Sequence, residues 1–103
     1  MKQTERVFKA LAEPRRIELL RILRNGKELS VGEISERVTV TQQAVSLHLK
    51  VLEDAGIVTA RKEGTRHLYA VRLEGFEPAN EFLASFWDGR LAKLKKLAEN
   101  KND

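Results

Sequence analysis

The segment from Val40 to Val58, VTQQAVSLHLKVLEDAGIV, most narrowly limits the folds open to this chain. At 100° per residue, Val45, Leu49 and Leu52 fall within about 60° of one another on a helix, so they must face a core. The opposite side carries amides, a hydroxyl and one aliphatic group, whereas a merely solvated face would more often carry Glu and Lys. The pattern predicts a helix that runs to Gly56 and uses its outer face for contact.

A second helical signal lies directly upstream of this segment. Ser30-Val31-Gly32-Glu33 has the Ser-x-x-Glu form of a capping box, which predicts a short helix to about Val38. A turn at Thr39–Val40 follows, and Thr41 can cap the next helix. Two short helices separated by such a turn have the spacing and length of a helix-turn-helix.

The pattern changes to β-rich after Gly56. The run IVTARKEGTRHLYAV gives two strand-like segments around Glu63-Gly64, which predicts a hairpin. A helix-turn-helix followed at once by a basic hairpin describes a winged helix. We therefore expect an α+β, mostly α, winged helix-turn-helix with about five helices and a two-stranded wing, in a single domain over residues 1–103. The other predicted helices cover about residues 4–11, Pro14 to a C-cap at Gly26, and about 78–99.

Composition narrows the function classes. The net charge of +4 favours a polyanionic partner, although many basic proteins bind none. The chain has no Cys, which excludes disulfides, thiolate metal sites and Cys nucleophiles. No apolar run approaches the roughly 20 residues of a membrane span, and the N-terminus lacks a signal-peptide stretch. We expect a cytoplasmic protein, and no enzyme, because no constellation of acid, base or nucleophile occurs.

The outer face of the helix after Thr41 fits base reading in double-stranded DNA. Gln can bond adenine as a bidentate pair, Leu47 can pack on a thymine methyl group, and Lys50 suits a phosphate or guanine. Basic residues at a hairpin tip can reach phosphates or the minor groove. The alternatives are a solvated helix face and an edge hairpin made soluble by its charges. The predicted DNA contacts are Thr41, Gln42, Gln43, Ser46, Leu47 and Lys50 on the helix, and Arg61, Lys62, Arg66 and His67 on the wing.

His48 lies on the flank of the apolar stripe rather than on the outer face. A flank position does not point into a groove. We therefore expect a partly buried histidine with a local hydrogen bond in preference to a base contact.

The last predicted helix has an apolar arc wider than one core requires. Phe82, Phe86 and Trp87 would bury large areas, which favours a dimer interface. The alternative is that both flanks of the arc pack inside one small subunit. Arg90 lies in the middle of this arc and needs a partner carboxylate if it is buried.

Three stretches resemble the ArsR-type winged helix-turn-helix repressors of bacteria and archaea: VFKALAEPRRIELLRIL, AVSLHLKVLEDAGIVTARKEG and the Trp-bearing last helix. The resemblance covers about residues 5–98, and FWDGRLAKL is similar to the metal-independent members. It implies an obligate dimer that binds a pseudo-palindromic operator overlapping a promoter. It also implies an interface built from the first and last helices, here Val7, Phe8, Leu11, Phe82, Phe86, Trp87, Leu91 and Leu94.

Metal-sensing relatives carry a two-Cys box where this chain has ELSVGEI, with Ser30 and Gly32 in it. A hydroxyl and a bare backbone do not replace thiolates. A second family site uses carboxylates and histidines of the last helix, which here offers Glu and Asp but no His. We expect a dimeric, sequence-specific repressor with no metal and no cofactor. Two alternatives remain open: a metal-responsive repressor with a non-Cys site, and a winged-helix protein-interaction module.

Overall fold

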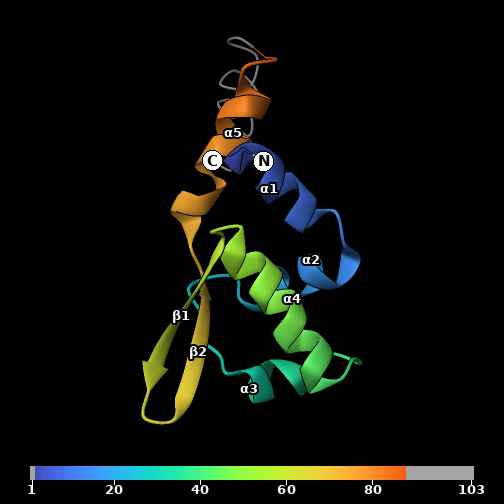
Figure 1. Ribbon diagram of the computed structural model, residues 1–103, viewed down its shortest axis with the longest axis vertical. Helices are drawn as coiled ribbons and strands as arrows, with labels where there is room; N and C mark the ends of the chain where they lie inside the picture. Colours follow the sequence, from blue (N-terminus) through green and yellow to red (C-terminus); the bar gives the residue numbers. More distant parts are fainter. Residues whose placement is uncertain (1, 88–103) are drawn as a thin grey trace, which may run out of the picture.

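The computed structural model describes residues 2–87 of the chain, and these form a helix-turn-helix with a two-stranded wing. In chain order the elements are α1 (Gln3–Leu11), α2 (Pro14–Ile22), α3 (Val31–Ser35), α4 (Gln42–Asp54), β1 (Val58–Glu63), β2 (Arg66–Val71), the 3-10 helix η1 (Leu73–Phe76) and α5 (Glu77–Ala84). In Figure 1, α1 and α5 lie together at one end of the molecule, and α4 crosses its middle. Helix α3 and the tip of the hairpin lie at the other end. The predicted fold class is confirmed.

Helix α4 is the element around which the core forms. Its stripe residues Val45, Leu49 and Leu52 are fully buried, as the periodicity predicts. Helices α1, α2 and α3 and strand β1 all pack against α4. The buried cluster consists of Val7, Ala10, Leu19, Leu23, Leu29, Ile34, Val45, Leu49, Leu52, Ala55, Ile57, Val58 and Ala79.

Both caps of the helix-turn-helix form as predicted. The Ser30 hydroxyl accepts the Glu33 backbone N–H at 3.2 Å, and the Glu33 carboxylate accepts the Ser30 N–H at 2.9 Å. The Thr41 hydroxyl accepts the Ala44 N–H at 3.1 Å. These bonds satisfy donors that would otherwise lack partners at the two helix N-termini.

The connection between α3 and α4 is longer than predicted. Helix α3 ends at Ser35 rather than near Val38, so residues 36–41 form the turn. The Arg37 and Val38 N–H groups bond carbonyls three residues back, which tightens the last turn. Three β-branched residues in a row, 38–40, then disfavour continued helix.

The predicted hairpin forms, with its turn one residue later than Glu63-Gly64, because Glu63 is the last residue of β1. Glu63 pairs with Arg66, and the two-residue connection begins with Gly64 at a φ of +62°. Glycine adopts this left-handed conformation without strain. One contact was not predicted: Leu29 forms an antiparallel bridge with Tyr69, through N–H···O bonds of 3.1 and 2.8 Å. The segment before α3 thereby extends the sheet on the free side of β2.

Helix α2 stops earlier than the sequence predicts. It ends at Ile22, whereas the expected C-cap was Gly26. Gly26 is left-handed with a φ of +75°, but Asn25 already has a φ of +68°. A right-handed helix ends before its first left-handed residue, so Asn25 moves the boundary upstream.

The last helix is also shorter within the described residues. It begins at Glu77 and ends at Ala84, and a turn occupies 85–87, whereas one helix over about 78–99 was predicted. The Ser85 hydroxyl donates to the Phe82 carbonyl at 2.6 Å, and such a bond competes with the helical pattern. Residues 88–99 of the predicted helix, with Arg90, Leu91 and Leu94, lie outside the described residues.

Gly75 in η1 provides a test of the fold. Its Cα faces the backbone so closely that an added Cβ would overlap the Gly56 carbonyl group. We expect Gly75→Ala to lower the free energy of unfolding by about 2–4 kcal/mol, because backbone atoms must move to make room. Urea unfolding measures this loss.

Gly32→Ala is the matched control. A Cβ there would meet the end of the flexible Gln42 side chain at 3.4 Å and the Ser30 hydroxyl at 3.9 Å, and both are ordinary contact distances. Alanine also suits a helix better than glycine, so the change should be neutral or stabilising by up to about 1 kcal/mol. Equal losses at both glycines would contradict the close approach of η1 to Gly56.

Candidate nucleic-acid interface

The N-terminal half of α4 exposes a polar face. Gln42, Gln43, Ser46 and Leu47 are all exposed and together line one shallow hollow. Leu47 is 69% exposed and is the one aliphatic side chain among these four residues. Burial of the opposite side of α4 holds these four residues outward. The structure therefore brings together four of the six residues predicted on this helix.

The other two predicted helix residues have local partners. The Thr41 hydroxyl is used as the N-cap of α4, although the residue itself is exposed. The Lys50 ammonium pairs with the Asp54 carboxylate at 3.2 Å, one turn further along the helix. Both side chains of that pair are about two-thirds exposed, so the pair contributes little to stability and leaves the ammonium accessible.

The four predicted wing residues divide between the two faces of the hairpin. Lys62 and His67 are directly opposite each other in the register, so they share one face. Arg61 is opposite Leu68, and Arg66 is opposite Glu63, which places both arginines on the other face. Side chains alternate along a strand, and this separation follows from the spacing alone.

Each of the two wing arginines is held by carboxylates. Arg61 donates to both Glu28 oxygens, from Nε at 2.6 Å and Nη2 at 3.0 Å, and also pairs with Glu63 at 3.0 Å. Arg66 donates from Nη2 to Glu33 at 2.6 Å. Sequence analysis missed these acids, because Glu28 and Glu33 are each 33 residues from their arginine and no local pattern connects them.

Hydrogen bonding changes the acidity of both carboxyl groups. The Arg61 guanidinium lowers the pKa of Glu28 below its ordinary value of 4.5. The pKa of Glu33 is lowered chiefly by the hydrogen bonds from Ser30, with a smaller effect from the charge of Arg66. Donors that bond the ionised form stabilise it, so both groups stay charged at neutral pH.

His48 is partly buried, as predicted, on the flank of α4. Its Nε2 lies 4.0 Å from a carboxylate oxygen of Glu13, the N-cap of α2. That distance is too long for a hydrogen bond. The expected local hydrogen bond is thus replaced by a nearby acid that the sequence did not indicate.

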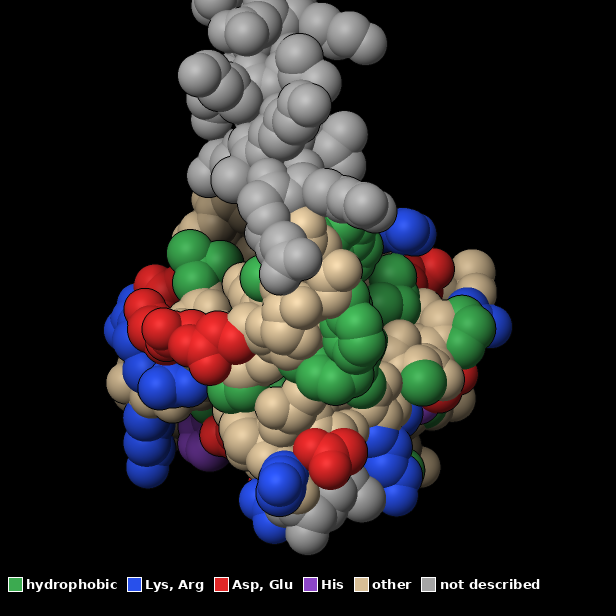
Figure 2. Space-filling model, turned by 90° about the horizontal axis from the view of Figure 1, so that it is seen from above, with side chains coloured by type: hydrophobic (Ala, Val, Ile, Leu, Met, Phe, Trp, Pro, Cys, Tyr) green, Lys and Arg blue, Asp and Glu red, His purple; other side chains and the backbone are tan. Residues whose placement is uncertain are grey.

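Aromatic side chains of α1 and α5 form an exposed apolar surface. The Phe8 and Phe82 rings meet edge to face at 5.7 Å, and the Phe82 and Phe86 rings at 5.0 Å. Phe82 is 47% exposed and Phe86 is 70% exposed. Figure 2 looks onto this end of the molecule and shows hydrophobic side chains gathered across it.

The predicted interface residues do not all lie on this surface. Phe8, Leu11 and Trp87 are half-buried, and Phe82 and Phe86 are exposed. Val7 has no exposed area, because it packs into the core of its own chain beside α4. Val7 is therefore a core residue, and Leu91 and Leu94 lie outside the described residues.

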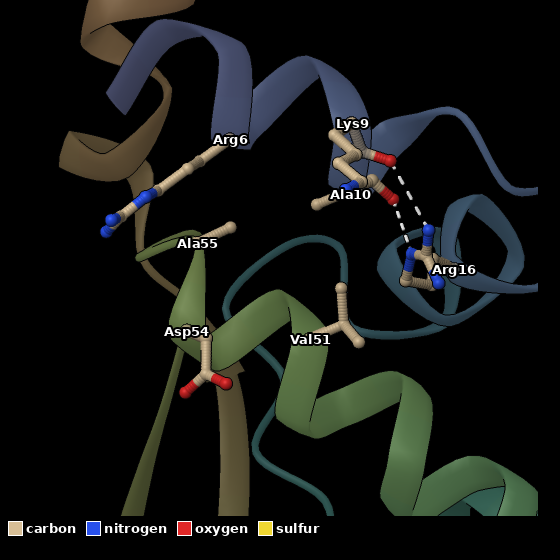
Figure 3. Close-up of a pocket in the computed structure, with 7 residues that line it drawn as sticks. All are labelled: Arg6, Lys9, Ala10, Arg16, Val51, Asp54 and Ala55. Atoms are coloured by element: carbon tan, nitrogen blue, oxygen red, sulfur yellow. Dashed lines mark hydrogen bonds between the residues drawn. The ribbon is translucent and has the colours of Figure 1, made fainter. Parts of the chain in front are cut away.

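A second hollow lies at the other end of α4, between α1, α2 and the α4 C-terminus. Figure 3 shows Arg16 of α2 donating to the carbonyls of Ala10 at 2.6 Å and Lys9 at 3.3 Å. These carbonyls belong to the last turn of α1, where the Lys9 carbonyl also accepts the Ala12 N–H at 3.2 Å. Arg16 thus fixes α1 to α2 above the apolar floor formed by Val51 and Ala55.

The part of the chain that the structure describes contains no group of three or more His, Cys, Asp or Glu side chains placed to hold a metal ion. None of the helices within residues 2–87 is both long and apolar enough to cross a membrane.

Residues 13–60, from the N-cap of α2 into β1, match the model of a known family, the bacterial regulatory proteins of the arsR family. The chain is 34% identical to the HTH-type transcriptional regulator Rv2034 of Mycobacterium tuberculosis, over 96% of this chain and 92% of that protein. The chain belongs to the ArsR family. It is a DNA-binding transcriptional regulator with a winged helix-turn-helix fold.

Two further ArsR-family relatives carry information on function and assembly. An arsenical resistance operon repressor of Staphylococcus xylosus is 34% identical, over 80% of this chain and 78% of that protein. The homodimeric winged helix-turn-helix DNA-binding domain of a possible ArsR-family regulator from Mycobacterium bovis is 33% identical, with a TM-score of 0.63. The match covers 97% of this chain and 81% of that one.

The lowered pKa of Glu33 predicts a pH-dependent contribution to stability. A carboxyl group with a folded-state pKa below its unfolded value stabilises the fold above the unfolded value and loses that effect as the pH falls through the folded value. We expect Glu33→Gln to be less stable than the wild type near pH 7. The difference should vanish well below pH 4.5, where the wild-type group is protonated. Urea unfolding across this range measures it.

Glu36→Gln serves as the control, because Glu36 lies at the end of the same helix and has no ion-pair partner within residues 2–87. The same pH-dependent difference for Glu36→Gln would contradict a specific role for the Glu33 contacts.

Proposed function

We propose that this chain is a homodimeric, sequence-specific repressor that binds a pseudo-palindromic operator. The observation that carries the proposal is the exposed face of α4, where Gln42, Gln43, Ser46 and Leu47 surround one hollow. Recognition helices enter the major groove by their N-terminal part, and these residues occupy that part of α4.

Each side chain has a role in the proposed complex. The Gln43 amide bonds the N6/N7 edge of adenine, and the Leu47 methyl groups pack on a thymine methyl. Thr41 and Lys50, at the margins of the face, contact the phosphate backbone. The wing lies beside the groove, where Arg61, Lys62, Arg66 and His67 contact phosphates. Phosphate contacts fix the orientation of the protein, and base contacts supply specificity.

The proposed dimer forms through the aromatic surface of α1 and α5. Phe82 and Phe86 leave large apolar areas in water, and single chains rarely expose such a surface without a partner. The homodimeric relative from Mycobacterium bovis supports a second copy of this chain as that partner. The proposed interface consists of Phe8, Leu11, Phe82, Phe86, Trp87, Leu91 and Leu94, without Val7.

Repression is the proposed outcome, because the chain resembles an arsenical resistance operon repressor. A dimer seated on an operator that overlaps a promoter excludes the polymerase by occupancy alone. The proposed function requires no catalytic step, metal or cofactor, and its site of action is the cytoplasm, where bacterial and archaeal promoters lie.

The first test separates base reading from backbone positioning. On an operator selected from random duplexes, Gln43→Ala should weaken binding by about 1–3 kcal/mol, with a much smaller effect on unrelated DNA. Lys62→Ala should weaken binding to both duplexes about equally and reduce the salt slope by about one unit. Fluorescence anisotropy at several salt concentrations measures both. Indistinguishable behaviour of the two variants would refute this division of roles.

The second test concerns the interface. Phe82→Ala with Phe86→Ala should weaken dimerisation by about 2–4 kcal/mol per site, because exposed aromatic anchors carry most of the binding energy. Sedimentation equilibrium measures the shift to monomer, and circular dichroism confirms that the fold persists. Leu73→Ala is the control, since Leu73 is 75% exposed but lies on η1. A double variant that remains a stable dimer would sink the assignment.

A further inference from the structure

The basic residues of the wing differ in whether a carboxylate already binds them. Lys62 and His67 share one face of the hairpin, and neither has an ion-pair partner among residues 2–87. Arg61 and Arg66 share the other face, and both are already bonded to carboxylates. Arg61 is bonded to Glu28 before α3 and to Glu63 of its own strand, and Arg66 is bonded to Glu33 of α3. DNA can engage the first pair directly, whereas the arginines must first leave their acids.

The geometry of the two arginine contacts allows that exchange. The N–O distances of 2.6–3.0 Å to Glu28 and Glu33 are those of charge-assisted hydrogen bonds. Yet the Arg61 and Arg66 side chains are 52% and 53% exposed, so a phosphate can reach them. Exposed ion pairs are weak, and a phosphate contact gains from counterion release.

The Glu33 carboxylate and the backbone next to Glu28 are held near the hairpin by bonds that do not involve the arginines. Glu33 accepts the Ser30 N–H at 2.9 Å as part of the capping box, so it stays at the N-terminus of α3 when Arg66 moves. Glu28 precedes Leu29, whose backbone N–H and C=O groups both bond to the backbone of Tyr69 in β2. Both carboxylates therefore stay close to the hairpin, where they compete with phosphates for Arg61 and Arg66.

We propose that Glu28 and Glu33 set the DNA affinity of this regulator by competing with phosphates for Arg61 and Arg66. The inference rests on the proposed function, because it presumes that the hairpin contacts DNA. Each carboxylate lowers affinity without touching a base, so the effect is the same on operator and on unrelated sequence. The acids keep the wing from binding any duplex tightly through charge alone, and α4 remains the part that selects the site.

The test uses the full chain with Glu28→Gln, Glu33→Gln and Glu36→Gln, and a random duplex as the probe. Glutamine can still accept the Ser30 N–H, so Glu33→Gln keeps the capping box. We expect Glu33→Gln to tighten binding about two- to fivefold at low salt. Glu28→Gln should tighten it less, because Arg61 remains paired with Glu63 at 3.0 Å. The slope of log affinity against log salt should steepen by up to about one unit per freed arginine. Glu36→Gln, which frees no arginine, should give a smaller gain and an unchanged slope.

A double-mutant cycle separates direct competition for the arginine from long-range electrostatic repulsion between the acid and DNA. In an Arg66→Ala background, Glu33→Gln should tighten binding no more than Glu36→Gln does, because the arginine that it would free is absent. The same gain in both backgrounds would mean that the acid acts by long-range repulsion, and the proposal would fall. Unchanged or weaker binding in the single variants would also overturn it, since the pairs would then hold the wing in its binding position.

Lys62→Ala distinguishes the failure of this inference from the failure of the proposed function. If Lys62→Ala weakens DNA binding while the Glu→Gln variants have no effect, only the competition is wrong. If neither Lys62→Ala nor Arg66→Ala has an effect on DNA binding, the hairpin is not a DNA-contacting wing, and both the wing assignment and the inference fail.

Discussion

Burial of one stripe of α4 is the constraint on which the rest of the structure depends. Val45, Leu49 and Leu52 have no exposed area, and together they fix the rotation of the helix about its own axis. A turn of α4 by one residue position, 100°, would place a buried leucine in water at a cost of about 1.5–3 kcal/mol for each side chain. Gln43, Ser46 and Leu47 point outward because the other side of α4 has only one stable orientation.

Local signals in the sequence predicted the elements that local chemistry determines. The capping box at Ser30, the N-cap at Thr41 and the glycine turn of the hairpin each depend on neighbours within a few residues, and each forms as predicted. The face of α4 was predictable for the same reason, since the period of a helix converts spacing into direction. Fold class and the candidate reading surface therefore followed from the sequence.

The features that the sequence analysis missed depend on contacts between residues far apart in the chain or on the backbone conformation at helix ends. The Leu29–Tyr69 bridge and the Arg61–Glu28 pair join segments 40 and 33 residues apart, respectively, and no periodicity indicates them. The early end of α2 depends on the left-handed conformation of Asn25. Asn adopts this conformation more readily than most residues, so the Asn25-Gly26 pair was a signal that the prediction did not use. The interface role given to Val7 came from family resemblance, which predicts a helix at the interface but not which of its sides the core takes.

The β1–β2 wing shows why the net charge of a chain is a poor guide to its binding surface. Four basic residues on the hairpin were predicted to contact DNA, and the alternation of side chains divides them between two faces. On one face, acids from α3 and from the segment before it reduce the charge that the wing presents. The net charge of +4 therefore does not predict where, or how strongly, the molecule attracts phosphate.

Hydrogen bonds at the ends of α1 connect the proposed dimer interface to α4. Arg16 bonds the last carbonyls of α1, and Gln3 at the other end of α1 donates to the Ala55 carbonyl at the end of α4. Hydrogen bonds have preferred angles, whereas apolar contacts are far less directional. These bonds therefore fix the position of α1 along α2 and α4 more narrowly than packing alone would. Any dimer formed through α1 and α5 therefore holds its two α4 helices at a set separation. A two-fold dimer of this kind matches half-sites spaced by whole turns of the duplex, about 10–10.5 bp each. In the proposed complex, selection of an operator then depends on the spacing fixed by α1 and α5 as much as on the bases that contact α4.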